Sequence, residues 1–147
     1  LDGDDVVYVV RSAARHRLMA ITLSVGTRLP AAYTSMGRVL LAQLSESELL
    51  AFLDGVRLER FTESSIIDKG ELRRSIDQAR EQGYSIVDQE LDSGLRSVAV
   101  PVFAGSGELL GAINISTNAA RVDLETLMQT YLPRLQEAAE AVSRTTR

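Results

Sequence analysis

The chain has 147 residues, of which 45% are hydrophobic and 24% charged, and its net charge is −4 at neutral pH. This length and composition predict one globular domain large enough to bury a core. An acidic chain is a poor candidate for holding nucleic acid, because phosphate binding needs a basic face. The lack of cysteine and the single histidine, His16, exclude disulfides, Cys–His pairs and multi-histidine metal sites within one chain.

The sequence contains no apolar run of the ~18 residues that a membrane helix needs, and no signal sequence at its start. We therefore expect a cytoplasmic protein that makes no membrane contact. Because the chain begins with Leu1 rather than Met, a preceding domain is also to be expected.

The first 30 residues predict a pair of strands followed by a loop. Residues 6–10 are β-rich and follow a Gly/Asp turn, which predicts a strand. We expect residues 18–24 to be its antiparallel partner and residues 11–17 to connect the two. Residues 25–30 are punctuated by Gly26 and Pro30 and read as a loop.

Three helices are predicted next. Thr34 or Ser35 caps a helix that runs to about residue 43. Ser45 and Glu48 have the spacing of a capping box, and the helix that follows ends near Gly55. The residues that we expect it to bury are Leu49, Leu50, Phe52 and Leu53.

Residues 57–67 show no period and predict a loop. Asp68 is the expected cap of the third helix, which presents one apolar stripe and stops at Gly83. The stripe consists of Leu72, Ile76 and Ala79.

The last third predicts strands over residues 84–90, 95–103 and 108–116, with the latter two forming a hairpin around residues 105–107. Asp123 is the expected cap of a final helix, which Pro133 should kink or break. Hairpins rather than βαβ units predict an α+β domain with a mostly antiparallel sheet and helices packed on its faces. A GAF-like or profilin-like sensor fold has this shape.

The sequence gives little support to catalysis. No Gly-x-Ser-x-Gly, Walker or Gly-x-Gly-x-x-Gly motif is present, so we expect neither an enzyme nor a bound cofactor. Asp88 and Glu90 lie on one face of a strand and could form the acid/base pair of a hydrolase. A solvated strand end explains these two carboxylates more simply. We expect His16 to be a residue of the hairpin connection.

Three segments place small polar residues on apolar elements, which is typical of a small-molecule pocket. They are Thr34-Ser35-Met36 at a helix start, Leu95-Arg96-Ser97 and Asn114-Ile115-Ser116. Asn114 and Ser116 are two residues apart and share one side of the sheet, which Ser97 can share from the partner strand. Leu18, Ile21 and Leu29 can supply an apolar wall.

An anionic guest is favoured by two features of these segments. The start of the helix at residues 34–36 offers free backbone N–H groups. Arg17, Arg28 and Arg96 lie close to the polar segments, and a guanidinium can hold a carboxylate in a bidentate fork. Solvent exposure is the simpler explanation for each arginine taken alone.

Several segments, in this order and spacing, resemble the C-terminal effector-binding domain of IclR-type bacterial transcription regulators over nearly the whole chain. They include Gly26-Thr27-Arg28-Leu29-Pro30, the run from Thr34 to Ala42, Gly83-Tyr84, Asp88-Gln89-Glu90-Leu91, the run from Gly94 to Val102, and the run from Ala112 to Ser116. The run Thr-Ser-Met-Gly-Arg-Val-Leu-Leu-Ala looks most like the PcaR/PobR/PcaU branch, which regulates aromatic-acid breakdown through the β-ketoadipate pathway.

The resemblance implies that residues 1–147 form the ligand-sensing domain of a homodimeric or tetrameric regulator. It also implies a winged helix-turn-helix domain before residue 1, through which alone the regulator would bind DNA. The effector would be a small organic acid such as protocatechuate, 4-hydroxybenzoate or β-ketoadipate. It would act by binding two domain arrangements with different affinities.

The resemblance implies which residues of this chain line the family's ligand pocket. We add Arg96 to them, because it lies in one of the polar segments. Two positions depart from many relatives, which have Asp at the position of Val87 and Cys at that of Ser97. The loss of the acidic residue suits an aromatic or longer acid, unless a register slip brings Asp88 into the wall. The predicted set is Leu18, Ile21, Leu29, Ser35, Met36, Val87, Leu95, Arg96, Ser97, Asn114 and Ser116.

Alternative functions stay open at this point. The domain could sense glyoxylate or pyruvate, as other branches of the family do. It could also be an oligomerisation module without a ligand, for which the long last helix is suited. A hydrolase that uses Asp88 and Glu90 is the third alternative.

Overall fold

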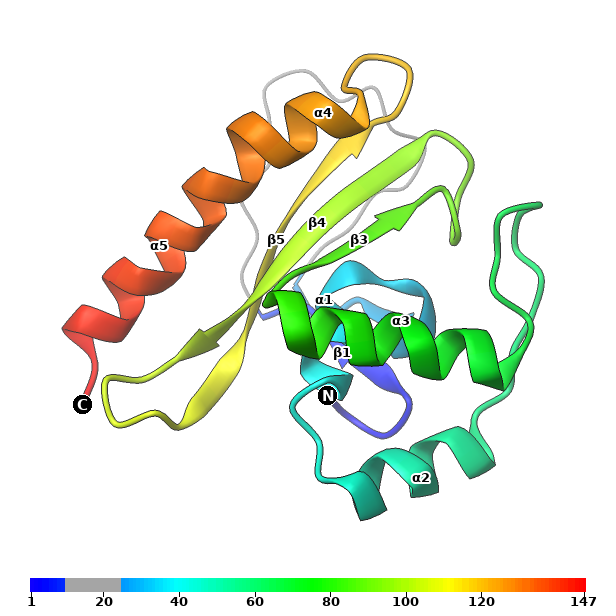
Figure 1. The fold of residues 1–147 in the computed structure, drawn as a ribbon, viewed down its shortest axis with the longest axis horizontal. Helices are drawn as coiled ribbons and strands as arrows, with labels where there is room; N and C mark the ends of the chain where they lie inside the picture. The colour runs from blue at the N-terminus through cyan, green and yellow to red at the C-terminus, as the bar shows by residue number, and fades with distance from the viewer. Residues whose placement is uncertain (10–24) are drawn as a thin grey trace.

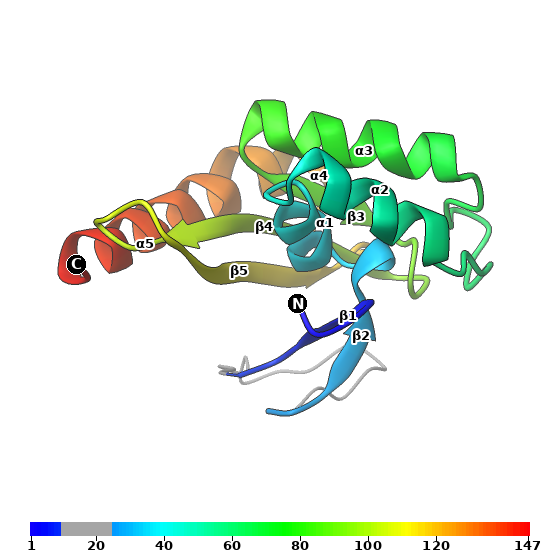
Figure 2. The same cartoon turned by 90° about the horizontal axis from the view of Figure 1, so that it is seen from below.

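The structure is a computed structural model that describes residues 1–9 and 25–147. Its centre is an antiparallel sheet in the order β3-β4-β5, formed by Ser85–Asp88, Leu95–Phe103 and Leu109–Asn118. A smaller antiparallel sheet pairs β1 (Asp5–Val7) with β2 (Arg28–Pro30). Figure 2 shows this β1–β2 ribbon at the bottom of the view and α3 at the top, with β4 and β5 between them. The predicted α+β class with antiparallel sheets is confirmed.

The start of the chain differs from the prediction. Residues 28–30, which were expected to be a loop, form strand β2, and Leu29 pairs with Val6 of β1. Pro30 is tolerated there because the Ala31 N–H donates to the carbonyl of Asp4, which leaves Pro30, opposite Asp5, at a position of the strand pair that needs no N–H. The strand predicted over residues 18–24 and the connection 11–17 lie outside the described residues.

The helices follow the predicted order. A short 3₁₀ turn, η1 (Ala31–Tyr33), leads into α1 (Ser35–Leu41), and α2 (Glu46–Gly55) and α3 (Lys69–Gln82) follow. After the sheet come α4 (Leu124–Thr126), a π-helical turn η2 (Leu127–Tyr131) and α5 (Leu132–Thr145). Figure 1 shows the last helical run lying along the sheet, with α3 on the other side of the molecule. Within the described residues, no helix combines the length and apolarity needed to cross a membrane.

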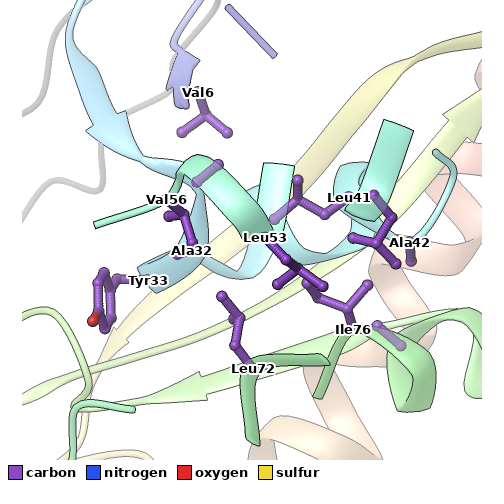
Figure 3. Packing of buried hydrophobic residues seen from close by; sticks show 12 residues of the cluster. Val6, Ala32, Tyr33, Leu41, Ala42, Leu53, Val56, Leu72 and Ile76 are labelled. Carbon is purple, nitrogen blue, oxygen red and sulfur yellow. The ribbon is translucent and has the colours of Figure 1, made fainter. Parts of the chain in front are cut away.

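Side-chain alternation on β4 separates two apolar clusters. Val98 and Val100 pack with Leu127, Leu132 and Leu135 of the last helical run. The larger cluster joins η1, α1, α2 and α3, and Figure 3 shows Tyr33, Leu41, Leu53, Leu72 and Ile76 converging in it. The α1 helix lies over all three strands of the sheet, so the two clusters cover opposite faces.

The predicted helix caps are confirmed. The side chains of Thr34, Ser45, Asp68 and Asp123 each accept a hydrogen bond from a backbone N–H in the first turn of the helix that follows. The backbone and hydroxyl of Ser45 both donate to Glu48, which holds the pKa of that carboxyl below its usual range.

The prediction for the buried face of α2 was only partly right. Leu49 and Leu53 are buried and Phe52 packs partly, but Leu50 is 53% exposed. In a helix, Leu50 points a full 100° away from Leu49, so the two leucines cannot share one narrow apolar face.

Pro133 acts on the turn before it, as the sequence predicts. Proline lacks an N–H and its ring crowds the carbonyl one turn earlier. The helix widens into the π-helical turn Leu127–Tyr131 and resumes with Pro133 in the first turn of α5. Leu127, Leu132 and Leu135 thereby all stay buried against the sheet.

Gly37 in α1 lies directly against the η1 turn. A Cβ added there would overlap the backbone carbonyl of Ala31, and Ala31 is itself fully buried. The α1 helix can approach η1 this closely only because residue 37 has no side chain.

We predict that Gly37→Ala lowers the free energy of unfolding by about 3 kcal/mol, since backbone must shift within a packed core. Gly55→Ala is the matched control, because a Cβ at this last residue of α2 meets no atom within 4 Å. It should leave stability unchanged or raise it slightly. Urea unfolding of both variants measures the difference, and equal effects would contradict the packing argument.

Candidate functional site

A cavity lies between the start of α1 and the face of the sheet that α1 covers. Measured out to its open mouth, it has a volume of about 390 Å³. The sheet contributes one wall, and β2, η1, α1 and the turn after β3 contribute the other. The lining residues are Tyr8, Leu29, Tyr33, Thr34, Ser35, Val87, Leu91, Leu95, Ser97, Asn114 and Ser116.

The strand register brings the sheet wall together. Val87 pairs with Ser97, and Ser97 pairs with Ser116, so the three side chains form one row across β3, β4 and β5. Asn114 lies two residues from Ser116 on the same face and donates its amide to the Ser116 hydroxyl at 3.2 Å. The shared face predicted for Ser97, Asn114 and Ser116 is confirmed.

A hydrogen bond joins the two walls of the cavity. The Ser97 hydroxyl donates to the Ser35 hydroxyl at 2.9 Å, and both residues are buried. Ser35 occupies this position because the Thr34 hydroxyl accepts from the Gly37 N–H and starts α1 at this point. Together with Ser116 and Asn114, these two serines form a polar row that spans both walls. Leu29, Leu91 and Leu95 also line the cavity.

A buried ion pair fixes α1 relative to β3. The Arg38 guanidinium is 1% exposed and donates to both carboxylate oxygens of Glu90, at 2.9 and 2.6 Å. Its Nε donates to the carbonyl of Ala32 at 3.0 Å, which ties η1 to the same group. Glu90 follows β3 and immediately precedes Leu91. The ion pair therefore holds the turn that carries Leu91 against α1.

The structure places seven of the predicted site residues on the cavity wall. They are Leu29, Ser35, Val87, Leu95, Ser97, Asn114 and Ser116. Leu18 and Ile21, like Arg17 and His16, lie outside the described residues. Met36 and Arg96 were also predicted to contact the ligand, but neither is among the cavity-lining residues.

Arg96 projects from the other face of the sheet, because it alternates with Leu95 and Ser97. Its guanidinium donates to Asp88 at 2.9 Å and to the carbonyls of Ala119 and Val122. Asp88 is therefore turned away from the cavity while Val87 lines it, so no register slip brings the carboxylate into the wall. Arg28 likewise donates to the carboxylates of Asp2 and Asp5.

Asp88 and Glu90 do not form an acid/base pair. Each carboxylate is paired with a different arginine on a different side of β3, which corrects the expectation of a solvated strand end. Within residues 1–9 and 25–147, no cluster of His, Cys, Asp or Glu could hold a metal ion.

The predicted set lacks four lining residues, of which Thr34 was recognised only as part of a polar segment and the other three were missed. Tyr8 lies beyond β1, Tyr33 ends η1 and Leu91 follows the buried ion pair. The large side chain of Leu91, next to an acidic residue at a strand end, was the available signal for an apolar wall.

Comparison with known proteins decides the family. Residues 1–144 match the family model described as bacterial transcriptional regulator IclR, C-terminal. The chain belongs to the IclR family. Its relatives are transcription regulators rather than enzymes, and the fold is the GAF-like one of the family's effector domains.

The chain is 46% identical over 139 residues to the Pca regulon regulatory protein of Pseudomonas putida, covering 95% of this chain and 48% of that protein. A transcriptional regulator of Rhodococcus sp. RHA1 is 45% identical with a TM-score of 0.93, covering 98% of this chain and 58% of that one. A PobR inducer-binding domain from Acinetobacter, a double mutant in complex with 3-hydroxybenzoic acid, is 29% identical. Its TM-score is 0.88, covering 97% of this chain and 83% of that one. The chain thus spans about half the length of the curated relatives it matches.

We predict that Glu90→Gln lowers the free energy of unfolding by about 3 kcal/mol, because it leaves the Arg38 charge buried without a counter-ion. Glu46→Gln is the matched control, since it removes an exposed carboxylate that pairs with Arg73 and should cost less than about 1 kcal/mol. Urea unfolding compares the two variants. A similar small loss in both would show that the Arg38–Glu90 pair is dispensable.

Proposed function

We propose that residues 1–147 are the ligand-sensing domain of a regulator of aromatic-acid catabolism, and that the ligand is a small aromatic or dicarboxylic acid. Protocatechuate, 4-hydroxybenzoate and β-ketoadipate are the candidates. The observation that carries the proposal is the cavity, whose lining combines leucine and valine side chains with three serines and one asparagine. This pairing of an apolar wall with a few convergent polar groups suits a small amphipathic ligand.

The similar proteins support the choice of ligand class. One relative is named for the Pca regulon, and one similar structure is an inducer-binding domain in complex with 3-hydroxybenzoic acid. Val87 supports it as well, because a buried valine on the sheet wall offers an aromatic ring an apolar surface.

The candidate contacts are the seven predicted residues on the wall, namely Leu29, Ser35, Val87, Leu95, Ser97, Asn114 and Ser116. Within the described part of the chain, no Arg, Lys or His lines the cavity. We therefore propose that the carboxylate accepts hydrogen bonds from serine hydroxyls and the Asn114 amide, rather than from Arg96. Neutral donors of this kind can rotate to meet an acid.

In the whole regulator, we propose that a winged helix-turn-helix domain before residue 1 binds DNA and that ligand binding biases its arrangement. Such coupling requires the ligand to bind two arrangements with different affinities. We also propose that the regulator is a cytoplasmic homodimer or tetramer.

A thermal-shift panel tests the ligand class directly on this chain. We expect a ligand at a hundredfold excess over its Kd to add about 2.7 kcal/mol of stability. Protocatechuate, 4-hydroxybenzoate and β-ketoadipate should raise the Tm, whereas glyoxylate and pyruvate should not. A shift with glyoxylate or pyruvate alone would favour another branch of the family, and a flat response to all five would overturn the ligand class.

We predict that Ser35→Leu abolishes the ligand-induced shift, because a leucine side chain at this buried position projects into the cavity and removes the Ser35–Ser97 hydrogen bond. Ser47→Leu is the matched control on the exposed start of α2. Asn114→Leu tests the opposite wall should Ser35→Leu prove unstable. Undiminished affinity in a folded Ser35→Leu variant would place the site elsewhere.

A further inference from the structure

Residues 57–67 contain neither helix nor strand, yet they are bound closely to the cavity wall. Ser65 is 6% exposed, and its hydroxyl donates to the carbonyl of Glu90 at 2.6 Å. The same oxygen accepts from the backbone N–H groups of Phe61 and Thr62, at 3.0 and 2.9 Å. One buried hydroxyl therefore organises this segment and attaches it to the turn after β3.

A second hydroxyl repeats the attachment one residue away. Thr62 donates its side-chain O–H to the carbonyl of Gln89 at 2.6 Å. Gln89 has a φ of 60°, so its backbone is in the left-handed region that non-glycine residues seldom adopt. The Thr62 and Ser65 hydroxyls thus hold the carbonyls of two successive residues at the point where the chain turns away from β3.

The turn at residues 89–94 is anchored from the strand side as well. The Gln89 N–H donates to the carbonyl of Leu95 at 2.8 Å, and the Gln89 side-chain oxygen accepts from the Gly94 N–H at 3.1 Å. Leu91, the next residue after Glu90, projects from this turn into the cavity wall. Its position follows from where the Gln89 and Glu90 carbonyls are held.

The two walls of the cavity differ in how easily they can move. Val87, Ser97 and Ser116 belong to strands that are paired through their backbones. Leu91 belongs to a turn that is held mainly by side chains, namely the Thr62 and Ser65 hydroxyls and the Arg38 guanidinium on Glu90. Because side-chain contacts to the turn can change without breaking the backbone pairing of the sheet, the Leu91 turn is the part of the wall that can adjust to the size of a ligand.

The same segment also reaches a second lining residue. The Tyr33 hydroxyl donates to the carbonyl of Ile66 at 2.7 Å and accepts from the Glu59 N–H at 2.8 Å. The Phe61 ring stacks edge-on against Tyr33, with 5.1 Å between the ring centroids. Residues 57–67 therefore bridge Tyr33 and Leu91 on the same side of the cavity.

We propose that Ser65 and Thr62 are positioning residues that set the distance of Leu91 from the sheet, and thereby the size of acid that the cavity admits. The proposal rests on the proposed function, since it concerns the selectivity of that same cavity. Neither side chain lines the cavity, so both act through Leu91.

The test is the ratio of affinities for a larger and a smaller acid, measured by calorimetry with 2-naphthoate and benzoate. Ser65→Ala frees the Glu90 carbonyl and should shift the ratio toward 2-naphthoate by about fivefold, within the range that pocket changes produce. Leu91→Ala should shift the ratio in the same direction. The Ser65→Ala/Leu91→Ala double variant should shift it no further than Leu91→Ala alone, because the two changes act on one wall.

Ser64→Ala is the matched control, since Ser64 is exposed and its N–H, which donates to Thr62, is kept. Thr62→Val provides an independent variant if Ser65→Ala does not fold. Equal changes in both affinities, or additive shifts in the double variant, would overturn the positioning role while leaving the proposed function intact. Failure of the unaltered chain to bind either of these acids or any member of the thermal-shift panel would overturn both.

Discussion

The pairing of Arg38 with Glu90 is the constraint on which the cavity depends. A guanidinium that is 1% exposed needs a counter-ion, and Glu90 supplies both carboxylate oxygens. Because Arg38 also holds the carbonyl of Ala32, one charged group joins η1, α1 and the turn after β3. Two neighbouring segments, η1 and α1, and a third that lies 52 residues beyond Arg38 are thereby held in one arrangement around the polar row.

Close backbone packing complements this ion pair. Gly37 allows α1 to touch η1, and the Thr34 cap fixes the first turn of the helix. The Ser35 hydroxyl can then reach Ser97 across the cavity. The cavity wall thus depends on a glycine and a cap that set the start of α1 against η1, and on a buried charge pair that ties α1 to the turn after β3.

The sequence predicted those features that depend on local chemistry. Caps such as Ser45 and Asp68 bind N–H groups three residues away, so their spacing is visible in the chain. The shared face of Asn114 and Ser116 follows from strand alternation. The same alternation places Arg96 opposite Ser97, so its absence from the cavity wall could have been predicted from the strand assignment alone.

Other features depend on contacts that no local pattern contains. Arg38 and Glu90 are 52 residues apart, and each taken alone resembles a surface charge. Ser65 lies in a segment without periodicity, so its role becomes apparent only when the turn after β3 is brought against it. The same is true of Leu91, because its contribution to the cavity wall depends on that turn.

The alternation of side chains along β4 has a consequence for how the protein can change over evolutionary time. Ser97 faces the cavity, whereas Val98 and Val100 face the leucines of the last helical run. Strand β4 therefore separates the residues that would determine ligand specificity, on one face, from those that pack in the second apolar cluster, on the other. Substitutions on the cavity face can accumulate without disturbing the packing beneath α5. Such a division allows one scaffold to diversify its ligands while its folding requirements stay the same.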